Sequence, residues 1–350
     1  MLSPRADRVL NSIIDRYITK AQPVPSQSLI GEFELEVSSA TIRNEVAHLE
    51  QGGYVTRPHL SAGSIPSDKG YRYYVASLKE VELPMPEKRL ISHLFHQVED
   101  DLEAWLRLSA TVIARLLGNM AVVSLPRPQN CRLRLVELIV IQENLVLMVL
   151  IFYGGRIREQ LLNFEHSASQ SILSAMAVKL NQHYCGLTSQ QILDKKTELS
   201  PAEEQAMSVI TRIMQTEDEQ AYQEPYLDGL HLMLSQPEFT LSQRVRGLLE
   251  LVEHRGLLKA IVPPKTADKT IQVIIGCENQ AETFRDYSVV IGRYGLRGDA
   301  VGNLAVVGPT RMAYPHAIAA VSYLASVLSE LVTELHGKGK NEALVQNEAK

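Results

Sequence analysis

The sequence is poor in the residues that build disulfide frameworks, zinc modules and secreted domains. It has three cysteines among 350 residues, Cys131, Cys185 and Cys277, and no two of them form a C-x-x-C pair. This spacing argues against a disulfide framework or a zinc module and fits a reducing cytosol. The N-terminus has no basic start followed by an apolar stretch, so we expect no secretory signal. We therefore predict a cytoplasmic protein.

A continuous hydrophobic run is also missing. The most apolar segment, 133–153, is interrupted by Glu137 and by the polar run 142–144. A membrane-spanning helix needs about 20 consecutive, mainly apolar residues. We expect no membrane partner.

The motifs of common enzymes are missing as well. The sequence contains no G-x-G-x-x-G, no G-x-x-x-x-G-K-[ST] phosphate loop and no G-x-S-x-G nucleophile elbow. His93 and His96 form H-x-x-H, but metalloprotease helices carry H-E-x-x-H, which favours an ordinary surface helix over a metal site. The segment 308–312, GPTRM, either binds an anion at a helix N-terminus or forms a tight turn, and we favour the turn. We predict no enzyme, no cofactor and no metal.

Bulk charge gives no indication of nucleic-acid binding. The net charge is −5, and the first 80 positions hold nine basic and nine acidic residues. Any argument for DNA binding must therefore rest on the pattern and placement of side chains.

The first 80 residues have a distinctive order of elements. Ser3-Pro4 predicts the start of a helix over 4–19, and a short second helix follows from Ser26. The stretch SSATIRNEVAHLEQGGY, which starts at Ser38, predicts a third helix that ends at the double glycine. A β-prone run and a loop rich in Pro, Ser and Gly come next, and the tyrosine-rich segment at 71–75 resumes as a strand or a helix. Three small helices followed by a hairpin form the layout of a winged helix-turn-helix.

The third helix has one apolar and one polar face. Its residues Ile42, Val46 and Leu49 fall within roughly 60° of one another and define the buried face. In a helix-turn-helix the second helix of the motif lies in the major groove, and its N-terminal residues face the bases. The candidate DNA-binding residues on this helix are Ser39, Ala40, Thr41, Arg43, Asn44 and His48.

Arginine and asparagine suit base recognition, since each forms two hydrogen bonds, with guanine and adenine respectively. Further basic residues flank the expected wing and suit phosphate contacts, which position the protein without reading sequence. These candidates are Arg57, His59, Lys69 and Arg72. The alternative remains open that Asn44 and His48 are ordinary solvated positions and that Tyr71 only packs the wing.

The rest of the chain alternates strands and helices. Residues 81–86 form a proline-containing linker, and 87–120 has a helical pattern. A three-strand meander is expected at 133–141, 145–152 and 156–162. Residues 167–234 are mostly helical, and a helix follows at 241–254. Strands at 271–275, 288–291 and 304–307 precede a helix at 315–335. Strands split by a long helical section predict a multidomain α+β protein with one domain inserted into another.

Several motifs together resemble the family of the heat-inducible transcription repressor HrcA. They are VSSATIRN at 37–44, RPHLSAG at 57–63, DKGYR at 68–72 and GNLAVVGPTRM at 302–312. The resemblance implies a winged-helix DNA-binding domain, a GAF-like α+β domain and an inserted, mainly helical dimerisation domain. We accordingly expect a winged helix at 1–83, the GAF-like domain at 84–155 and 236–336, the insertion at 156–235, and a disordered tail at 337–350.

The resemblance also implies a function. Members of the family repress chaperone operons by binding an inverted repeat, the CIRCE element, as homodimers, and the chaperonin GroEL modulates their activity. The chain departs from the family pattern at Pro25, where glycine is usual, and at Ser64, where arginine is usual. A metabolite-sensing transcriptional regulator, with a small ligand in the GAF-like domain, is the alternative expectation.

Overall fold

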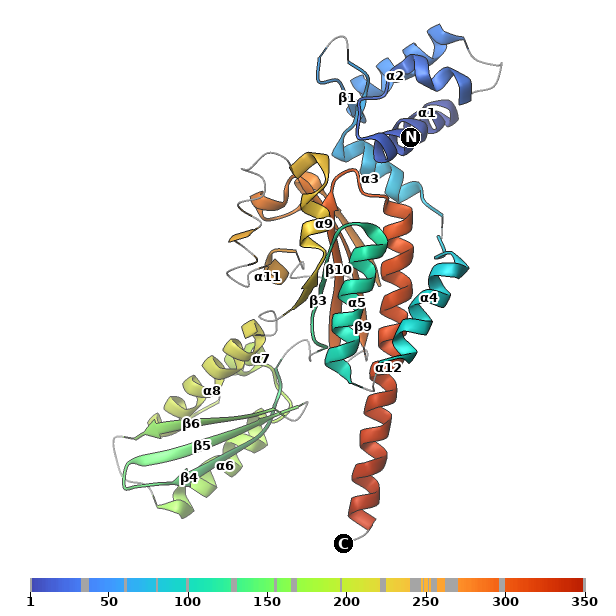
Figure 1. The fold of residues 1–350 in the computed structure, drawn as a ribbon. Coiled ribbons are helices and arrows are strands. Elements are labelled where there is room, and N and C mark those ends of the chain that lie inside the picture. The colour runs from blue at the N-terminus through green and yellow to red at the C-terminus, as the bar shows by residue number, and fades with distance from the viewer. Residues whose placement is uncertain are drawn as a thin grey trace. The chain divides into compact units, whose positions relative to one another are not determined.

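The computed structural model describes most of the chain and has an α+β fold. It describes residues 2–32, 38–59, 62–79, 81–98, 101–126, 131–153, 156–164, 169–195, 197–220, 225–239, 247, 249–250, 252, 257–261, 270–295 and 300–348. These residues form two compact units (Figure 1). The first unit comprises Met1–Ser124, Pro225–Gly295 and Asn303–Lys350, and the second comprises Leu125–Glu224 and Leu296–Gly302.

The first unit begins with three helical elements and a small hairpin. Each α-helix here starts at a serine whose side chain accepts a hydrogen bond from a free backbone N–H of the first turn: Ser3 from Ala6, Ser38 from Thr41, and Ser67 from Gly70. The elements are α1 (Pro4–Lys20), the 3-10 helix η1 (Ser26–Glu32), α2 (Ser39–Gln51), β1 (Val55–Thr56), β2 (Ile65–Pro66) and α3 (Asp68–Ser77). Strands β1 and β2 pair antiparallel.

A five-stranded sheet forms the centre of the first unit, in the order β7-β3-β10-β9-β8 (Figure 1). Helix α12 packs on β9, α5 packs on β3, and the two helices contact each other. The strands are β3 (Met120–Val123), β7 (Tyr226–Asp228), β8 (Ile271–Ile275), β9 (Tyr287–Gly295) and β10 (Val301–Pro309). The remaining elements are α4 (Met85–His96), α5 (Leu102–Leu117), α9 (Leu230–Leu234), η2 (Pro237–Phe239), α11 (Leu257–Ile261), η3 (Gly276–Glu278), η4 (Glu282–Phe284) and α12 (Tyr314–Glu348).

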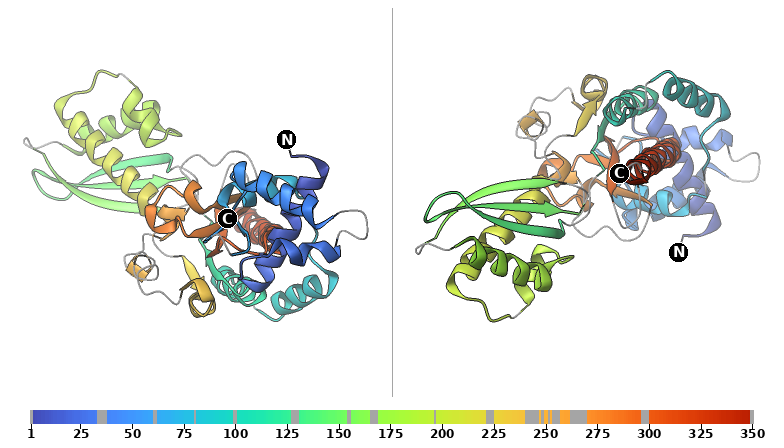
Figure 2. Two further views of the ribbon diagram at one scale, coloured as in Figure 1. Left: turned by 90° about the horizontal axis from the view of Figure 1, so that it is seen from above. Right: turned by 90° about the horizontal axis from the view of Figure 1, so that it is seen from below.

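The second unit is a three-stranded antiparallel sheet with helices on one side (Figure 2). Alternate residues of the strands, such as Met148, Leu150 and Phe152 of the central strand, are fully buried against Leu180 and Ile210 of the helices. The elements are β4 (Leu133–Val140), β5 (Leu145–Phe152), β6 (Ile157–Asn163), α6 (Gln170–Tyr184), α7 (Ser189–Asp194) and α8 (Pro201–Gln220).

The limits of this unit differ from the insertion expected at 156–235. Strands β4 and β5, expected in the GAF-like domain, pair with β6 and share its core. Residues 226–228 form β7, which pairs with β3 of the first unit. The second unit is therefore a mixed sheet-and-helix body and not a mainly helical one.

Two further segments bear on the sequence expectations. The helix expected at 241–254 lies almost entirely outside the described residues. The tail expected to be disordered, 337–350, instead continues α12 as far as Glu348. This segment has no proline and is rich in Lys, Glu, Ala and Gln, which are good helix formers.

The N-terminal part of α12 is a core helix. By length and composition alone, Tyr314–Glu334 is long and apolar enough to cross a membrane. Nearly half of that stretch is buried within the structure, and Val321, Leu324 and Leu328 are at most 1% exposed. Since α12 packs on β9, its apolar side is occupied by the sheet.

Candidate nucleic-acid interface

Helix α2 separates a packed face from an open one. Ile42, Val46 and Leu49 are buried, and α2 packs on α1 and η1. The opposite face carries the six candidate residues of this helix. Thr41 is half-buried, and the others are exposed: Ser39, Ala40, Arg43, Asn44 and His48.

The exposed end of α2 is its N-terminus. The backbone N–H of Thr41 donates to Ser38 Oγ at 3.2 Å, and the hydroxyls of Ser38 and Thr41 lie 2.9 Å apart. These contacts cap the first turn, while the free N–H groups of a helix start favour a nearby anion such as phosphate. Within the described part of the chain, neither Arg43 nor Asn44 has a side-chain hydrogen bond or ion pair. Both side chains are available to an external partner.

Arg57 and His59 follow strand β1. The Arg57 guanidinium lies 3.3 Å from the Glu50 carboxylate, and both side chains are at least one-third exposed. A surface pair of this kind contributes about 0–1 kcal/mol, so a phosphate can replace Glu50 at little cost. The His59 side chain is exposed.

Lys69 has a partner within the protein. Its Nζ donates to the carbonyl oxygen of Gly52 at 2.7 Å and lies 4.5 Å from the centroid of the Tyr54 ring. The ammonium therefore caps the C-terminal end of α2, where the helix dipole favours a cation. Because Lys69 remains exposed, it is still a candidate for a phosphate contact.

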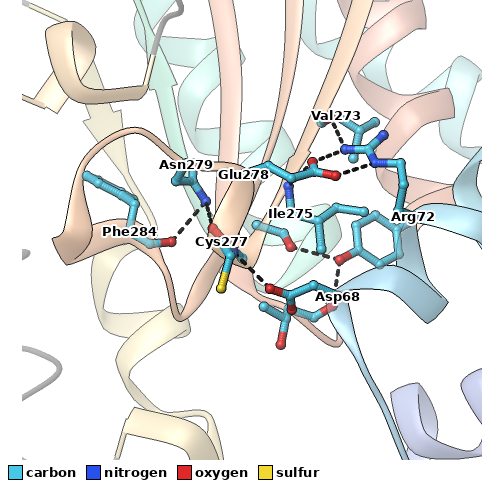
Figure 3. Close-up of polar contacts among 12 residues, drawn as sticks. Asp68, Arg72, Val273, Ile275, Cys277, Glu278, Asn279 and Phe284 are labelled. Carbon is cyan, nitrogen blue, oxygen red and sulfur yellow. Dashed lines mark hydrogen bonds and ion pairs between the residues drawn. The ribbon is translucent and has the colours of Figure 1, made fainter. Parts of the chain in front are cut away.

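Arg72 lies elsewhere. Its guanidinium forms an ion pair with the Glu278 carboxylate and donates to the carbonyl oxygen of Val273 at 2.7 Å (Figure 3). The sequence predicted a phosphate contact for this residue, and the structure directs it instead to the turn after β8. Asp68, one helical turn earlier, accepts a hydrogen bond from the backbone N–H of Cys277 at 2.8 Å.

Asp68, Cys277 and Glu278 are the polar residues that sequence reasoning missed. The i, i+4 spacing of Asp68 and Arg72 shows that both lie on one face of a helix. Their partners are more than 200 residues away in the chain, and no local pattern indicates them.

Ser64 also differs from its expected setting. It is 2% exposed, and its N–H and C=O both pair with Val24 at 2.8 Å. It is therefore a packed position next to η1 and not an exposed tip of the hairpin.

A cavity lies beside Arg72. Its volume is about 290 Å³, and its lining mixes polar residues with the apolar side chains of α11 and β8. Among the described residues, no group of three His, Cys, Asp or Glu side chains could hold a metal ion.

Comparison with known proteins points to one family of transcription repressors. The family model for the HrcA protein C-terminal domain matches residues 103–318. The heat-inducible transcription repressor HrcA of Dehalococcoides mccartyi (strain ATCC BAA-2266 / KCTC 15142 / 195) is 50% identical over 345 residues, which cover 98% of this chain and 100% of that protein. The protein of the same name from Roseiflexus castenholzii (strain DSM 13941 / HLO8) is 39% identical, with 96% of each chain covered. The chain belongs to the HrcA family.

A solved structure has a similar fold. The crystal structure of a hypothetical protein superimposes with a TM-score of 0.56 at 24% identity, covering 95% of this chain and 98% of that one.

Proposed function

We propose that this protein is a DNA-binding transcription repressor of heat-shock chaperone operons and has no catalytic activity. It acts in the cytoplasm as a homodimer on an inverted-repeat operator, the CIRCE element. The observation that carries the proposal is the open face of α2, where Arg43 and Asn44 stand exposed beyond a capped helix start. The family membership supports the same function.

The order of the N-terminal elements supports a winged helix-turn-helix. Helix α2 follows η1 and precedes the β1–β2 hairpin, so that α2 is the recognition helix and the hairpin is the wing. In this arrangement Arg43 and Asn44 read base edges in the major groove, while Arg57 contacts the phosphate backbone.

The dimer rests on the open face of the second unit's sheet. Two apolar rows cross its three strands, because Leu147 pairs with Ile139 and Leu161, and Ile151 pairs with Leu135 and Ile157. Ile157 and Leu161 are 53% and 54% exposed. A second copy of this chain on that face removes these side chains from water, and two linked heads bind a palindrome far more tightly than one.

Substitutions on α2 test the DNA-binding role. We expect Arg43→Ala and Asn44→Ala each to reduce discrimination between operator and scrambled DNA by about 1–3 kcal/mol. Arg57→Ala should weaken binding to both DNAs alike and flatten its salt dependence. Titration of labelled duplexes at several salt concentrations measures both effects.

Gln51→Ala is the matched control, because Gln51 is exposed at the far end of the same helix. It should leave discrimination unchanged. Unaltered operator preference in both Arg43→Ala and Asn44→Ala would contradict the assignment of α2 as the recognition helix.

Modulation by GroEL enters the proposal from the family resemblance. Heat then acts by depleting the DNA-competent dimer. A footprint upstream of a chaperonin operon, with and without GroEL, tests this part. Full operator affinity at raised temperature without chaperonin would overturn it.

A second candidate function is metabolite sensing in the first unit. The cavity of about 290 Å³ beside Arg72 favours it, because Gln272, Glu278 and Asn279 offer polar groups there. Thermal-shift measurements across a panel of metabolites test this function, and no shift with any compound would count against it.

A further inference from the structure

Helix α3 contacts the turn that follows β8 through two charged side chains (Figure 3). Arg72 Nε donates to Glu278 Oε1 at 2.6 Å, and Arg72 Nη2 bonds to the same carboxylate. The backbone N–H of Cys277 donates to Asp68 Oδ2 at 2.8 Å. The forked guanidinium matches the carboxylate geometrically, which makes this pair stronger and more directional than a lysine pair.

The receiving turn is held in place by its own hydrogen bonds. The Glu278 carboxylate also accepts from the backbone N–H of Ile275 at 2.9 Å. The buried side chain of Asn279 donates to the carbonyl oxygens of Gly276, Phe284 and Tyr287, each at 2.9 Å. The turn is therefore a preformed receptor for α3 and needs no ordering when α3 docks.

Gly276 makes the close approach feasible. Its φ is +51°, a conformation that favours glycine, and a Cβ at this position would lie 2.2 Å from Asp68 Oδ2. Any other residue would push the Asp68 carboxylate away from the turn.

Two more contacts support this attachment. Tyr71, between the two charged residues on α3, packs against Tyr314 at the start of α12 with ring centroids 5.6 Å apart. Arg311 donates to the carbonyl oxygen of Ile18 in α1 at 3.1 Å. On its other side α3 packs on α1, and Tyr74 donates to Asp15 at 2.9 Å.

We propose that Asp68 and Arg72, together with the Gly276–Glu278 turn, form a latch that fixes the recognition helix relative to the five-stranded sheet. Asp68, Arg72 and Glu278 are then positioning residues for operator binding. The inference rests on the proposed function. Two heads that must meet half-sites at a fixed spacing bind as one unit only when each joint holds its angle.

The latch and a phosphate contact by Arg72 predict opposite results for one substitution. Glu278→Gln removes a negative charge close to the DNA-binding elements. If Arg72 contacts phosphate, this change frees its guanidinium and strengthens binding. If Arg72 and Glu278 form the latch, Glu278→Gln weakens binding just as Arg72→Gln does.

The experiment measures binding of full-length protein to a labelled duplex with the whole inverted repeat and to one with a single half-site. We expect Arg72→Gln and Glu278→Gln to lose about fivefold to tenfold in affinity for the whole repeat. Affinity for the half-site and the salt dependence should be unchanged. The charge-swapped double variant Arg72→Glu/Glu278→Arg should recover part of the loss.

Glu282→Gln is the matched control. Glu282 lies four residues from Glu278, its side chain is 83% exposed, and it pairs only on the surface with Arg285. It should bind both duplexes like the unaltered protein.

Three outcomes would overturn the latch. Tighter binding by Glu278→Gln, with weaker and less salt-dependent binding by Arg72→Gln, would make Arg72 a phosphate contact. Equal losses on both duplexes would indicate damage to the head itself. If the unaltered protein does not prefer the repeat to scrambled DNA, the proposed function fails and the latch fails with it.

Discussion

At the scale of single residues, Ser64 and Pro25 form a neighbouring pair. Ser64 bonds through its backbone to Val24, and a Cβ on Gly63 would lie 2.6 Å from the backbone nitrogen of Pro25. These are the two positions at which the chain departs from the family pattern, and they meet across a gap of about 40 residues in sequence. The two departures are therefore best understood as one local change in packing.

This setting predicts the effect of restoring the arginine. We expect Ser64→Arg to lower the free energy of unfolding by about 1–3 kcal/mol, because the site is closed to a long charged side chain. Adding Pro25→Gly should reduce that cost, since residues in contact are not additive. Urea unfolding measures both effects. Thr56→Arg, at an exposed position of β1, is the control, and an equal loss there would contradict the argument.

The same scale shows how far sequence reasoning reaches in the candidate site. The exposure of Arg43 and Asn44 follows from helical periodicity, which is a local property. The partner of Arg72 does not, because Glu278 is 206 positions away. Nothing in the residues around Arg72 distinguishes a cation meant for phosphate from one that holds two parts of the protein together.

At the scale of elements, local patterns predicted most of the structure. Strand β8 lies at 271–275 as expected, and the three strands of the meander are present with shifts of one residue at their ends. The segment after the hairpin was left open between strand and helix. The Ser67 cap and the burial of Tyr71 and Tyr74, three residues apart, make it the helix α3.

Helix α2 depends on its neighbour α3 at its C-terminal end. Lys69 bonds to Gly52 and stacks on Tyr54, so we expect Lys69→Met to destabilise this end by about 1 kcal/mol. Faster hydrogen exchange at the last amides of α2 would report the loss. Lys79→Met, exposed beyond the end of α3, should leave that exchange unchanged, and an identical change in both variants would refute the capping role.

At the scale of the whole molecule, sequence reasoning found a split domain but misplaced its limits. Alternating apolar residues indicate that 133–152 forms strands, yet the same alternation suits either sheet. The choice depends on which helices cover the strands, and α6 and α8 lie later in the chain. Domain limits are therefore a property of tertiary packing that strand patterns do not contain.

The proposed dimer face is tested at this scale. We expect Ile157→Glu and Leu161→Glu to raise the dimer dissociation constant at least about tenfold, because each places a charge on an apolar contact surface. Sedimentation equilibrium measures the effect. Ile172→Glu is the matched control, since Ile172 is 60% exposed but lies on α6, on the helix side of the sheet. Dissociation caused equally by Ile172→Glu would place the interface elsewhere.

The contacts of α3 bear on how the protein can be recombined. A cut in the proline-containing segment at 81–86 separates the N-terminal residues in sequence, but Asp68 and Arg72 leave their partners behind on the other piece. The head is thus not a modular cassette. A chimaera that exchanges the first 83 residues for those of a relative should carry the matching Gly276–Glu278 turn with them, so that the graft consists of two segments.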